Sequence, residues 1–450
     1  MTQLKHDAQA RADGLTTMDL GQVLPLTAEL RAGHLVVGGV DMVQLAREQG
    51  TALYVMDVAH IKNQLRAYQA ALGAGAIVAF AGKAFLNIAM ARLLAAEHCH
   101  LDVSGGGELA IALAAGFDPA QIIVHGNNKT QLELSEAVAA KVGLVVVDCA
   151  EELQRLSRLA TAAGAEQAIL LRIKPGVVAA THQFVVTGAE DSKFGFGISD
   201  GMAQQAVQQA LELPGLRLKG LHVHIGSQIF EFSAYGQALL ALVDLVQQLK
   251  AGYGYAPEII DIGGGLGSAY AAGDEPPAIA DFGAFLTKQL QAGFTGLGLA
   301  IPQLIVEPGR SIVANAGVTL YTLGSIKDLK DIRCYVAVDG GMSDNIRPAL
   351  YDAHYEAVIA NKAEFSRDKL VTLVGKHCES GDFIASDASI QVPAVGDIVA
   401  VLATGAYNAT MSSNYNAQVR PAVVFVEDGV ATVVQRRETY ADLMARDMDF

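Results

Sequence analysis

The feature that most constrains the fold of this chain is a repeated pattern of short apolar runs that begins near residue 76. Each run ends in polar or glycine residues, and a segment with the apolar spacing of a helix follows it. Eight runs are predicted strands: residues 76–81, 100–103, 121–125, 144–148, 169–173, 218–225, 259–263 and 304–307. Helices are predicted at 89–96, 107–115, 131–140, 151–163, 202–213, 235–249 and 281–291. Eight strand–helix repeats are typical of an α/β fold, the closed parallel (β/α)8 barrel of TIM type.

The rhythm changes after about residue 310. Short β-rich runs follow at 318–323, 334–338, 369–374, 398–402, 422–426 and 431–435, and a single helix is predicted over 350–363. Near the N-terminus, residues 35–40 and 51–56 read as two further strands. We therefore expect a barrel domain over residues 46–310. An all-β sandwich or barrel domain, built from residues 1–45 and 311–450, would be completed by the N-terminal strands.

Composition excludes several classes of partner. The 450 residues carry 32 basic and 47 acidic side chains, and the resulting net charge of −15 argues against nucleic acid and anionic membranes as partners. The first ten residues lack the apolar core of a signal peptide, and no run reaches the ~18–20 apolar residues of a membrane span. The four cysteines form no C-x-x-C pair, which predicts a cytoplasmic protein without a zinc ribbon or disulfide framework.

Polar or glycine residues stand at the carboxyl end of every predicted barrel strand. In a barrel, these ends form one ring around a single pocket. Lys83 follows the first strand; burial there would favour its neutral amine, which can attack a carbonyl and form a Schiff base. A surface lysine at a loop edge is the alternative. The other strand-end residues are Asp102, His125, Asp148, Arg172 with Lys174, His224, Gly263–Gly265 and Glu307.

Two strand ends have features of an anion site. The glycines that follow Asp261 let successive backbone N–H groups converge on a phosphate, although a tight turn explains them equally well. At the last strand, Glu307 would project into the pocket, Gly309 would free its backbone for a second contact, and Arg310 would supply a planar fork for phosphate or carboxylate. A structural Glu–Arg pair is the alternative here.

The pair His222 and His224 has two functional readings. Both side chains would lie on one face of a strand, where they could bind a metal or where one ring could stack on a flat cofactor. We expect no metal, because Asp261 lies inside its strand and further ligands are lacking. In the β-rich part, Cys378 stands among polar residues and could donate a proton or act as nucleophile, unless it is an inert buried thiol.

Taken together and in order, these motifs resemble the fold-type III pyridoxal-phosphate-dependent amino-acid decarboxylases, which have an alanine-racemase-like architecture of barrel and β domain. The resemblance runs from about residue 35 to about residue 426. It departs from the family pattern at Phe85, Gly105, Lys376 with His377, and Val423. The matching stretches are residues 82–84, 102–109, 125–129, 187–188 with 192–195, 220–228, 261–265, 307–310, 347–351, 378–382 and 405–407.

The resemblance implies a role for each matching residue. Lys83 would hold pyridoxal 5'-phosphate covalently, His224 would stack on its ring, and Glu307 would pair with the ring nitrogen. Cys378 would be the catalytic proton donor, reaching across from a second subunit, so the active site would lie at a homodimer interface. The phosphate would be held by Ser227, Gly264, Gly265, Gly309, Arg310 and Tyr407, and the substrate by Arg310, Arg347, Tyr351, Glu379 and Tyr407.

The resemblance also implies an activity. It is closest to the branch that decarboxylates meso-2,6-diaminopimelate to L-lysine and carbon dioxide, the last step of lysine biosynthesis. The distal end of diaminopimelate carries both a carboxylate and an ammonium group, and Arg347 together with Glu379 would recognise this end. The near alternative is a related decarboxylase for ornithine, arginine or carrier-bound glutamate. More distant alternatives are a catalytically silent protein of this fold and a metal hydrolase.

Overall fold

A computed structural model of the chain describes residues 20–177 and 191–449. The described residues form two compact units. The β-rich unit comprises the chain up to Asn63, Ser268–Glu275 and the chain from Arg310 onward, and the barrel unit comprises Gln64–Gly267 and Pro276–Gly309. Residues 46–63 and 268–275 therefore group with the β-rich unit, unlike in the predicted division. Thr187, one of the residues that carry the resemblance, lies outside the described residues.

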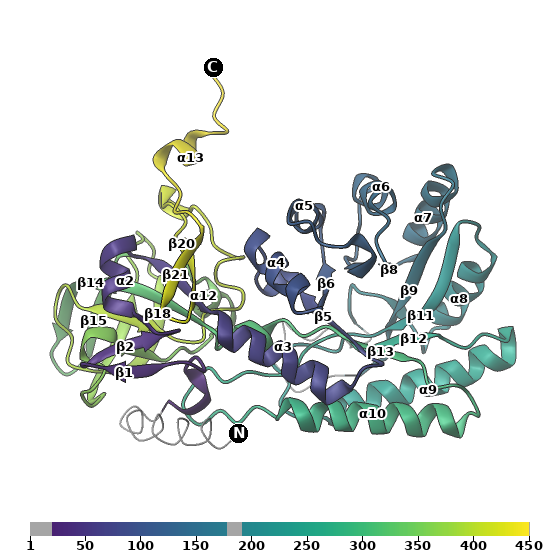
Figure 1. Ribbon diagram of the computed structural model, residues 1–450, viewed down its shortest axis with the longest axis horizontal. Helices are drawn as coiled ribbons and strands as arrows, with labels where there is room; N and C mark the ends of the chain where they lie inside the picture. The colour runs from purple at the N-terminus through teal and green to yellow at the C-terminus, as the bar shows by residue number, and fades with distance from the viewer. Residues whose placement is uncertain (1–19, 178–190, 450) are drawn as a thin grey trace. The chain divides into compact units, whose positions relative to one another are not determined.

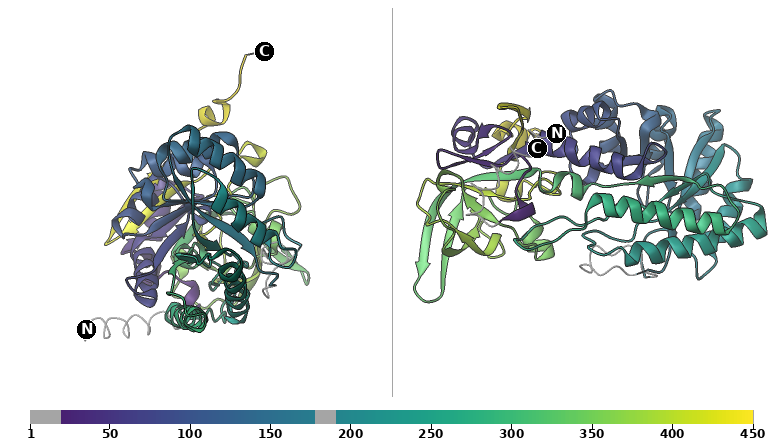
Figure 2. Two further views of the ribbon diagram at one scale, coloured as in Figure 1. Left: turned by 90° about the vertical axis from the view of Figure 1, so that its right-hand side faces the viewer. Right: turned by 60° about the horizontal axis from the view of Figure 1, so that its bottom comes forward.

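The barrel unit is built on eight parallel strands. Each strand pairs with the next, and pairing of the strand at 167–174 with the one at 144–147 joins the two halves into a closed ring, which confirms the predicted barrel (Figure 2, left). A short strand β10 (Phe196–Gly197) pairs with Ile173 and Lys174 at the carboxyl end of β9. The barrel strands are β5 (Ile77–Ala81), β6 (His100–Val103), β7 (Ile122–Val124), β8 (Leu144–Val147), β9 (Gln167–Lys174), β11 (Leu216–His222), β12 (Ile259–Asp261) and β13 (Gln303–Val306).

Helices follow the strands as predicted, and α9 and α10 lie side by side (Figure 1). Local chemistry explains their ends. Thr130 and Glu133 form a reciprocal capping box at the start of α6, and Gly254 in the left-handed region ends α9. The helices are α3 (Val58–Leu72), α4 (Ile88–Ala96), α5 (Gly106–Ala114), α6 (Gln131–Ala140), α7 (Ala150–Ala162), α8 (Met202–Glu212), α9 (Ser233–Tyr253) and α10 (Ile279–Gly296).

Apolar side chains fill the barrel interior, so the ring is a packed core. Small and β-branched residues from several strands meet there, and together they fix the strands whose ends carry the polar groups. The buried cluster consists of Ala79, Ile123, Leu144, Val146, Leu170, Ile259 and Ile305.

The β-rich unit contains a three-stranded sheet, β1 (Glu29–Arg31), β2 (His34–Val37) and β3 (Val40–Asp41), and a larger sheet. In the larger sheet, β4 (Leu53–Asp57) lies between β14, to which it is antiparallel, and β20, to which it is parallel. The remaining elements are α2 (Met42–Gln49), α11 (Arg310–Val313), α12 (Arg347–Tyr351), β14 (Gly317–Leu329), β15 (Arg333–Val338), β16 (Ala357–Ile359), β17 (Lys369–Val374), β18 (Phe383–Ile390), β19 (Ile398–Val401), β20 (Ala422–Glu427), β21 (Val430–Gln435) and α13 (Tyr440–Met444).

Two local predictions in this unit are wrong. The helix expected over 350–363 is only the short α12, because Asp352 adopts φ 49° and turns the chain, after which β16 pairs with β19. The strand expected over 35–40 is split into β2 and β3 by a turn at Gly38 and Gly39, both of which have positive φ.

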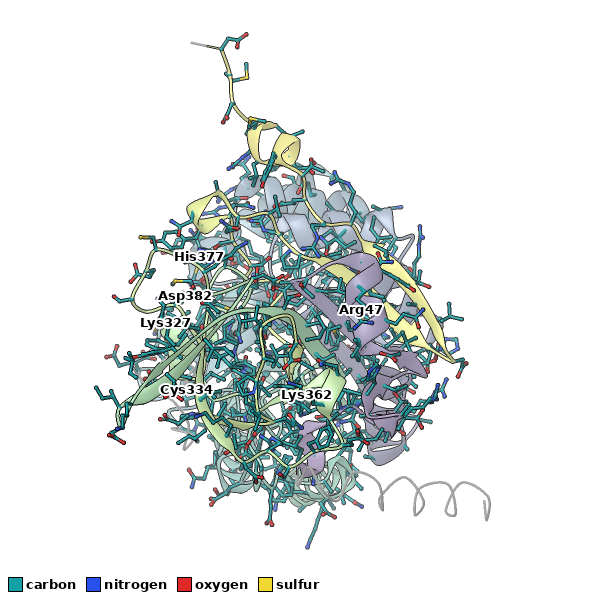
Figure 3. All side chains as sticks on the ribbon, turned by 90° about the vertical axis from the view of Figure 1, so that its left-hand side faces the viewer. Arg47, Lys327, Cys334, Lys362, His377 and Asp382 are labelled. Atoms are coloured by element: carbon teal, nitrogen blue, oxygen red, sulfur yellow. The ribbon has the colours of Figure 1, made fainter. Side chains whose placement is uncertain are left out.

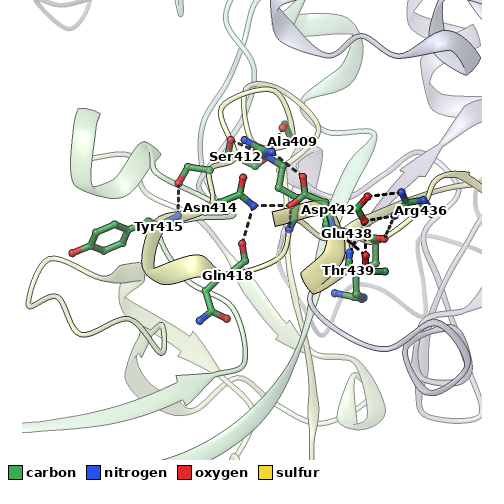
Figure 4. Close-up of polar contacts among 12 residues, drawn as sticks. Ala409, Ser412, Asn414, Tyr415, Gln418, Arg436, Glu438, Thr439 and Asp442 are labelled. Atoms are coloured by element: carbon green, nitrogen blue, oxygen red, sulfur yellow. Dashed lines mark hydrogen bonds and ion pairs between the residues drawn. The ribbon is translucent and has the colours of Figure 1, made fainter. Parts of the chain in front are cut away.

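Polar contacts fasten the C-terminal segment to the loop at residues 409–420 (Figure 4). The Nη1 atom of Arg420 lies 2.9 Å from Oε1 of Glu438, and Asn414 donates to the other oxygen of the same carboxylate. Thr439 then caps α13. Among the helices of the described ranges, α9 included, none combines the length and apolar character that crossing a bilayer requires.

Candidate active site

A buried carboxylate, Glu307, lies at the carboxyl end of the barrel strands. Its Oε1 atom is 2.5 Å from Nε2 of His125, and its Oε2 atom is 3.3 Å from Nε2 of His222. Burial by itself raises the pKa of Glu307, but the charge and hydrogen bond of His125 and the hydrogen bond of His222 outweigh it and hold that pKa well below its ordinary value. Burial lowers the pKa of His222 to about 3. Glu307 is therefore the anion of this cluster, and His222 is a neutral partner.

A second carboxyl group, Asp261, shares the cluster. It is fully buried at the end of β12, and burial together with the neighbouring charge of Glu307 raises its pKa well above the ordinary value. Two carboxylates this close do not both ionise, so Asp261 holds the proton and Glu307 the charge. Asp102 completes the cluster, with its Oδ1 atom 3.8 Å from Nε2 of His125. Glu307 and Asp261 differ in charge because the two histidines face Glu307.

Four of these groups lie close enough to hold a metal ion, contrary to the prediction that ligands would be lacking. One ligand atom each from His125, His222, Asp261 and Glu307 falls within 4.8 Å of the others. The chemistry of the donor set speaks for a hydrogen-bonded network instead. The shortest contact, between His125 and Glu307, uses two of the ligand atoms for each other. The absence of a metal remains a prediction.

Lys83 lies on the turn that follows β5, as predicted. Its side chain is exposed, so the burial expected to favour its neutral form is not observed. The residue nevertheless faces the acidic end of the barrel, because its charge lowers the pKa of Asp102 and of Glu108, whose pKa values burial raises. Gly309 packs closely against the turn that carries Lys83, because a Cβ atom at Gly309 would lie 2.9 Å from that of Ala84.

His224 comes after the end of β11, so the prediction that it shares a strand face with His222 is wrong. Burial, followed by the positive charges of Lys83 and Arg172, holds the pKa of His224 well below its ordinary value, and its ring is neutral. The ring lies against Gly263, where a Cβ atom would stand 2.7 Å from Nδ1. Glycine at this position therefore makes room for a flat imidazole that faces the barrel end.

The glycines after β12 form a backbone cradle. A Cβ atom at Gly264 would lie 2.2 Å from the carbonyl oxygen of Glu307, and one at Gly265 would lie 2.6 Å from that of Gly226. Tyr235 fixes the turn by donating to the carbonyl of Gly264 at 3.1 Å. Within residues 20–177 and 191–449, no protein group accepts from the N–H groups of Gly264 and Gly265. Close backbone approach with available N–H groups fits a phosphate.

The β-rich unit holds a separate cluster of cations and phenols. Arg310 donates from Nη1 to the hydroxyl of Tyr270 at 2.8 Å, and Arg347 donates to the hydroxyl of Tyr355. Both guanidinium groups are buried, and Arg310 also lies 4.8 Å from the centre of the Tyr407 ring. We call Tyr270, Arg310, Arg347, Tyr355 and Tyr407 the arginine–tyrosine cluster. Tyr351 is half-buried on α12.

The loop that carries Cys378 is fixed at its base and open at its tip. The carboxylate of Asp382 accepts from the N–H groups of His377 at 2.8 Å and Met342 at 2.6 Å, and His377 and Asp382 lie together in Figure 3. Cys378 and Glu379 are exposed at the tip. The reading of Cys378 as a buried inert thiol is therefore wrong, and its sulfur is open to a partner.

Sequence reasoning assigned no role to three residues of these clusters. His125 was noted only as a strand-end residue, yet it makes the shortest contact to Glu307. Tyr270 and Tyr355 belong to no recognised motif, and their link to the two arginines exists only in the folded β-rich unit.

Comparison with known proteins agrees with the geometry. Residues 58–314 match the model of the pyridoxal-binding domain of pyridoxal-dependent decarboxylases. The diaminopimelate decarboxylase of Bacillus subtilis is 44% identical over 421 residues, which cover 93% of this chain and 96% of the relative. That of Mycobacterium tuberculosis strain H37Rv is 44% identical over 431 residues, with 93% and 96% covered.

Solved structures give the same picture. The diaminopimelate decarboxylase of M. jannaschii, in complex with L-lysine, superposes with a TM-score of 0.89 and 34% identity, covering 96% of this chain and 99% of that one. The similarity therefore spans both the barrel unit and the β-rich unit.

Proposed function

The chain belongs to the diaminopimelate decarboxylases of the pyridoxal-dependent decarboxylase family, and from this premise we propose how its residues perform that reaction. The protein is a pyridoxal-phosphate-dependent carboxy-lyase. It removes one carboxyl group from meso-2,6-diaminopimelate and releases L-lysine and carbon dioxide. This reaction is the last step of lysine biosynthesis.

We assign the cofactor to the barrel unit. Lys83 would hold it covalently through the ε-amine, His224 would contact its ring, and Glu307 would pair with its ring nitrogen. Bound pyridoxal phosphate supplies the electron sink that takes up the charge left when carbon dioxide departs. Ser227, Gly264, Gly265 and Gly309 offer N–H and hydroxyl groups to the phosphate, with Arg310 and Tyr407 as further donors.

The electrostatics of Glu307 support its role. An anionic carboxylate that faces a ring nitrogen keeps a proton on that nitrogen, and a protonated ring withdraws electrons more strongly. Glu307 has this charge state because His125 and His222 hold its pKa well below the ordinary value. The single observation that carries the mechanism is this buried carboxylate, with the Nε2 atoms of His125 and His222 at 2.5 Å and 3.3 Å from its two oxygens.

We assign substrate recognition to Arg310, Arg347, Tyr351, Glu379 and Tyr407. The distal end of diaminopimelate carries a carboxylate and an ammonium group. Guanidinium groups bind the carboxylate through paired N–H donors, and Glu379 suits the ammonium group. A diamine precursor such as ornithine lacks the distal carboxylate, so the buried arginines favour diaminopimelate over the alternative substrates.

We propose that Cys378 returns a proton to the Cα atom after carbon dioxide leaves, and that it acts on the site of a second subunit. Its exposure, together with that of Glu379, supports such a reach. The enzyme would then be a homodimer, with each active site completed at the subunit interface. The cytoplasm is the compartment that suits a reduced, exposed thiol.

The decisive experiment uses a panel of substrates. The purified protein is incubated with pyridoxal phosphate and meso-diaminopimelate, ornithine, arginine or lysine, and carbon dioxide and the amine product are measured. We expect L-lysine from meso-diaminopimelate at a rate far above that of the other substrates. A preference for ornithine or arginine would identify the related decarboxylase instead. Metal analysis of the active protein tests the metal-hydrolase alternative.

A further inference from the structure

Tyr270 belongs to a short segment anchored in the β-rich unit. The carboxylate of Asp274 accepts from the backbone N–H groups of Tyr270 at 2.8 Å and Ala271 at 3.0 Å, and Asn315 donates to the carbonyl of Ala269 at 2.7 Å. The phenol ring is buried, with 7% of its surface exposed. The position of the Tyr270 ring is therefore set by the backbone hydrogen bonds of this segment rather than by the contacts of its hydroxyl.

Two guanidinium groups lie against this one phenol. Arg310 donates to its oxygen at 2.8 Å, and the guanidinium carbon of Arg347 lies 4.8 Å from the ring centre. Tyr355 packs edge-on against the ring with 5.5 Å between centres and also accepts a hydrogen bond from Arg347. Among the described residues, Arg347 has no carboxylate at ion-pair distance. Tyr270 is thus the group that the two cations have in common.

The charges around Tyr270 favour its ionised form. Burial raises the pKa of the phenol, but the positive charges of Arg310 and Arg347 outweigh burial, and the net pKa lies below the ordinary value. The other charged or titratable groups that face it are Tyr355, Tyr407 beyond Arg310, and Asp274 at its backbone. A buried pair of like charges is stabilised by an electron-rich oxygen and ring between them.

We propose that Tyr270 is a positioning residue that holds Arg310 and Arg347 side by side, so that both guanidinium groups bind the carboxylate which L-lysine and meso-diaminopimelate share. The inference rests on the proposed function, because that function supplies the ligand. When the substrate carboxylate binds, it compensates part of the positive charge of Arg310 and Arg347 that otherwise acts on the phenol oxygen of Tyr270. By linkage, carboxylate binding makes ionisation of Tyr270 harder, and ionisation of Tyr270 weakens carboxylate binding.

The test follows the ionisation of Tyr270 in the holoenzyme by NMR. Tyrosine labelled with carbon-13 at the ζ position is incorporated, and the Tyr270 resonance is the one lost in Tyr270→Phe. We expect it to reach the phenolate position at lower pH than the resonance of exposed Tyr440. L-lysine should shift that transition to higher pH. Cadaverine, which has the same amines without the carboxylate, should leave it unchanged, as should inorganic phosphate.

Steady-state kinetics give the second readout. Tyr270→Phe should raise KM for meso-diaminopimelate by about tenfold, the effect of one lost hydrogen bond to a charged group, while kcat changes by less than about threefold. Tyr321→Phe is the matched control: it removes a buried hydroxyl of the same unit that has no hydrogen-bond partner among the described residues. That control should leave KM unchanged.

Three results would overturn the inference. They are a Tyr270 resonance that titrates together with Tyr440 or above it, a transition that L-lysine does not move, and a transition that only inorganic phosphate moves. Failure of the proposed function is distinguishable, because it appears as absent carbon dioxide release by the unmodified protein. An active protein with an unresponsive Tyr270 refutes the positioning role alone.

Discussion

The Nε2 atom of His125 lies 2.5 Å from the Oε1 atom of Glu307, although 182 residues separate them in the chain. Barrel closure makes this contact, because it brings the ends of β7 and β13 to the same face of the ring. The contact determines which of two buried carboxyl groups is charged. Glu307 has the histidine partners and is the anion, and Asp261 keeps its proton.

Replacement of Glu307 by glutamine tests the charge on that side chain. Glu307→Gln keeps nearly the same shape but removes the anion that we assign to the ring nitrogen. We expect kcat to fall by about 10²-fold or more, whereas the cofactor remains bound through Lys83 and keeps the protein yellow. Absorbance spectra and initial rates measure the two effects. Full activity of this variant would contradict the assignment.

Asp261→Asn is the matched change at the neighbouring carboxyl group. The pKa of Asp261 is higher in the folded state than in the unfolded state. Asp261 therefore lowers the free energy of unfolding at any pH above its unfolded-state pKa, and this loss grows until the pH reaches the folded-state pKa. Asparagine removes this loss, and we expect the free energy of unfolding at pH 8 to rise by about 1–3 kcal/mol. Denaturant unfolding at pH 8 and at acid pH measures it. An Asn variant that is less stable at pH 8 would show that Asp261 is ionised.

Removal of the lysine amine tests the cofactor anchor. We expect Lys83→Ala to lose the yellow colour after dialysis and to lose about 10³-fold or more in kcat, because the variant lacks the amine that we assign to the aldehyde carbon. Lys250→Ala, at an exposed lysine of α9, is a lysine control that should stay yellow and active. An unchanged spectrum of Lys83→Ala would remove Lys83 from the mechanism.

Complementation between two inactive variants tests the shared site. If the proposed homodimer forms, Lys83→Ala and Cys378→Ala should each be inactive, but a mixed dimer of the two should have one site with both groups intact. After subunit exchange of equal amounts, we expect about one quarter of the wild-type activity. If activity stays at the level of the separate variants, Cys378 serves the site of its own subunit or does not take part.

A change at Arg347 tests recognition of the distal carboxylate. Arg347→Met keeps the length and apolar character of the side chain but removes the buried charge. We expect kcat/KM for meso-diaminopimelate to fall by about 10²-fold or more, while the kcat/KM for ornithine, which keeps the reacting carboxyl group but lacks the distal carboxylate, is unaffected. Arg333→Met, a change to a partly exposed arginine of the same unit that pairs with Asp387, should leave kcat/KM unaltered.

Much of the barrel could be predicted because its signals are local. The strand at 100–103 and the helix at 131–140 match the structure at both ends, since the apolar period and the Thr130 cap lie within a few residues. The predicted helix at 350–363 failed because Asp352 adopts a left-handed turn and the following strand is fixed by a partner about 40 residues away. Alanine-rich helical propensity was overridden by sheet pairing.

The residues of the site could be predicted from the sequence, but the contacts between them and their charge states could not. Position at strand ends pointed to Lys83, His125 and Glu307, yet which carboxyl group is charged depends on contacts between β7, β11, β12 and β13. The side-chain exposure of Lys83 and the link from Tyr270 to the arginines likewise depend on the folded chain. Sequence patterns describe what each segment contains, whereas pKa values depend on what surrounds each group.

The order in which the chain is synthesised determines when β4 can pair with its neighbouring strands. Leu53–Asp57 leaves the ribosome early, but the strands on its two sides are made late, from Gly317 and from Ala422. Every barrel strand has been synthesised by Val306. The barrel can therefore acquire structure on the nascent chain, whereas the other unit is assembled only when translation is almost finished. A polypeptide cut short before residue 422 would keep an open edge on its most buried N-terminal strand, and such a product should be prone to aggregation.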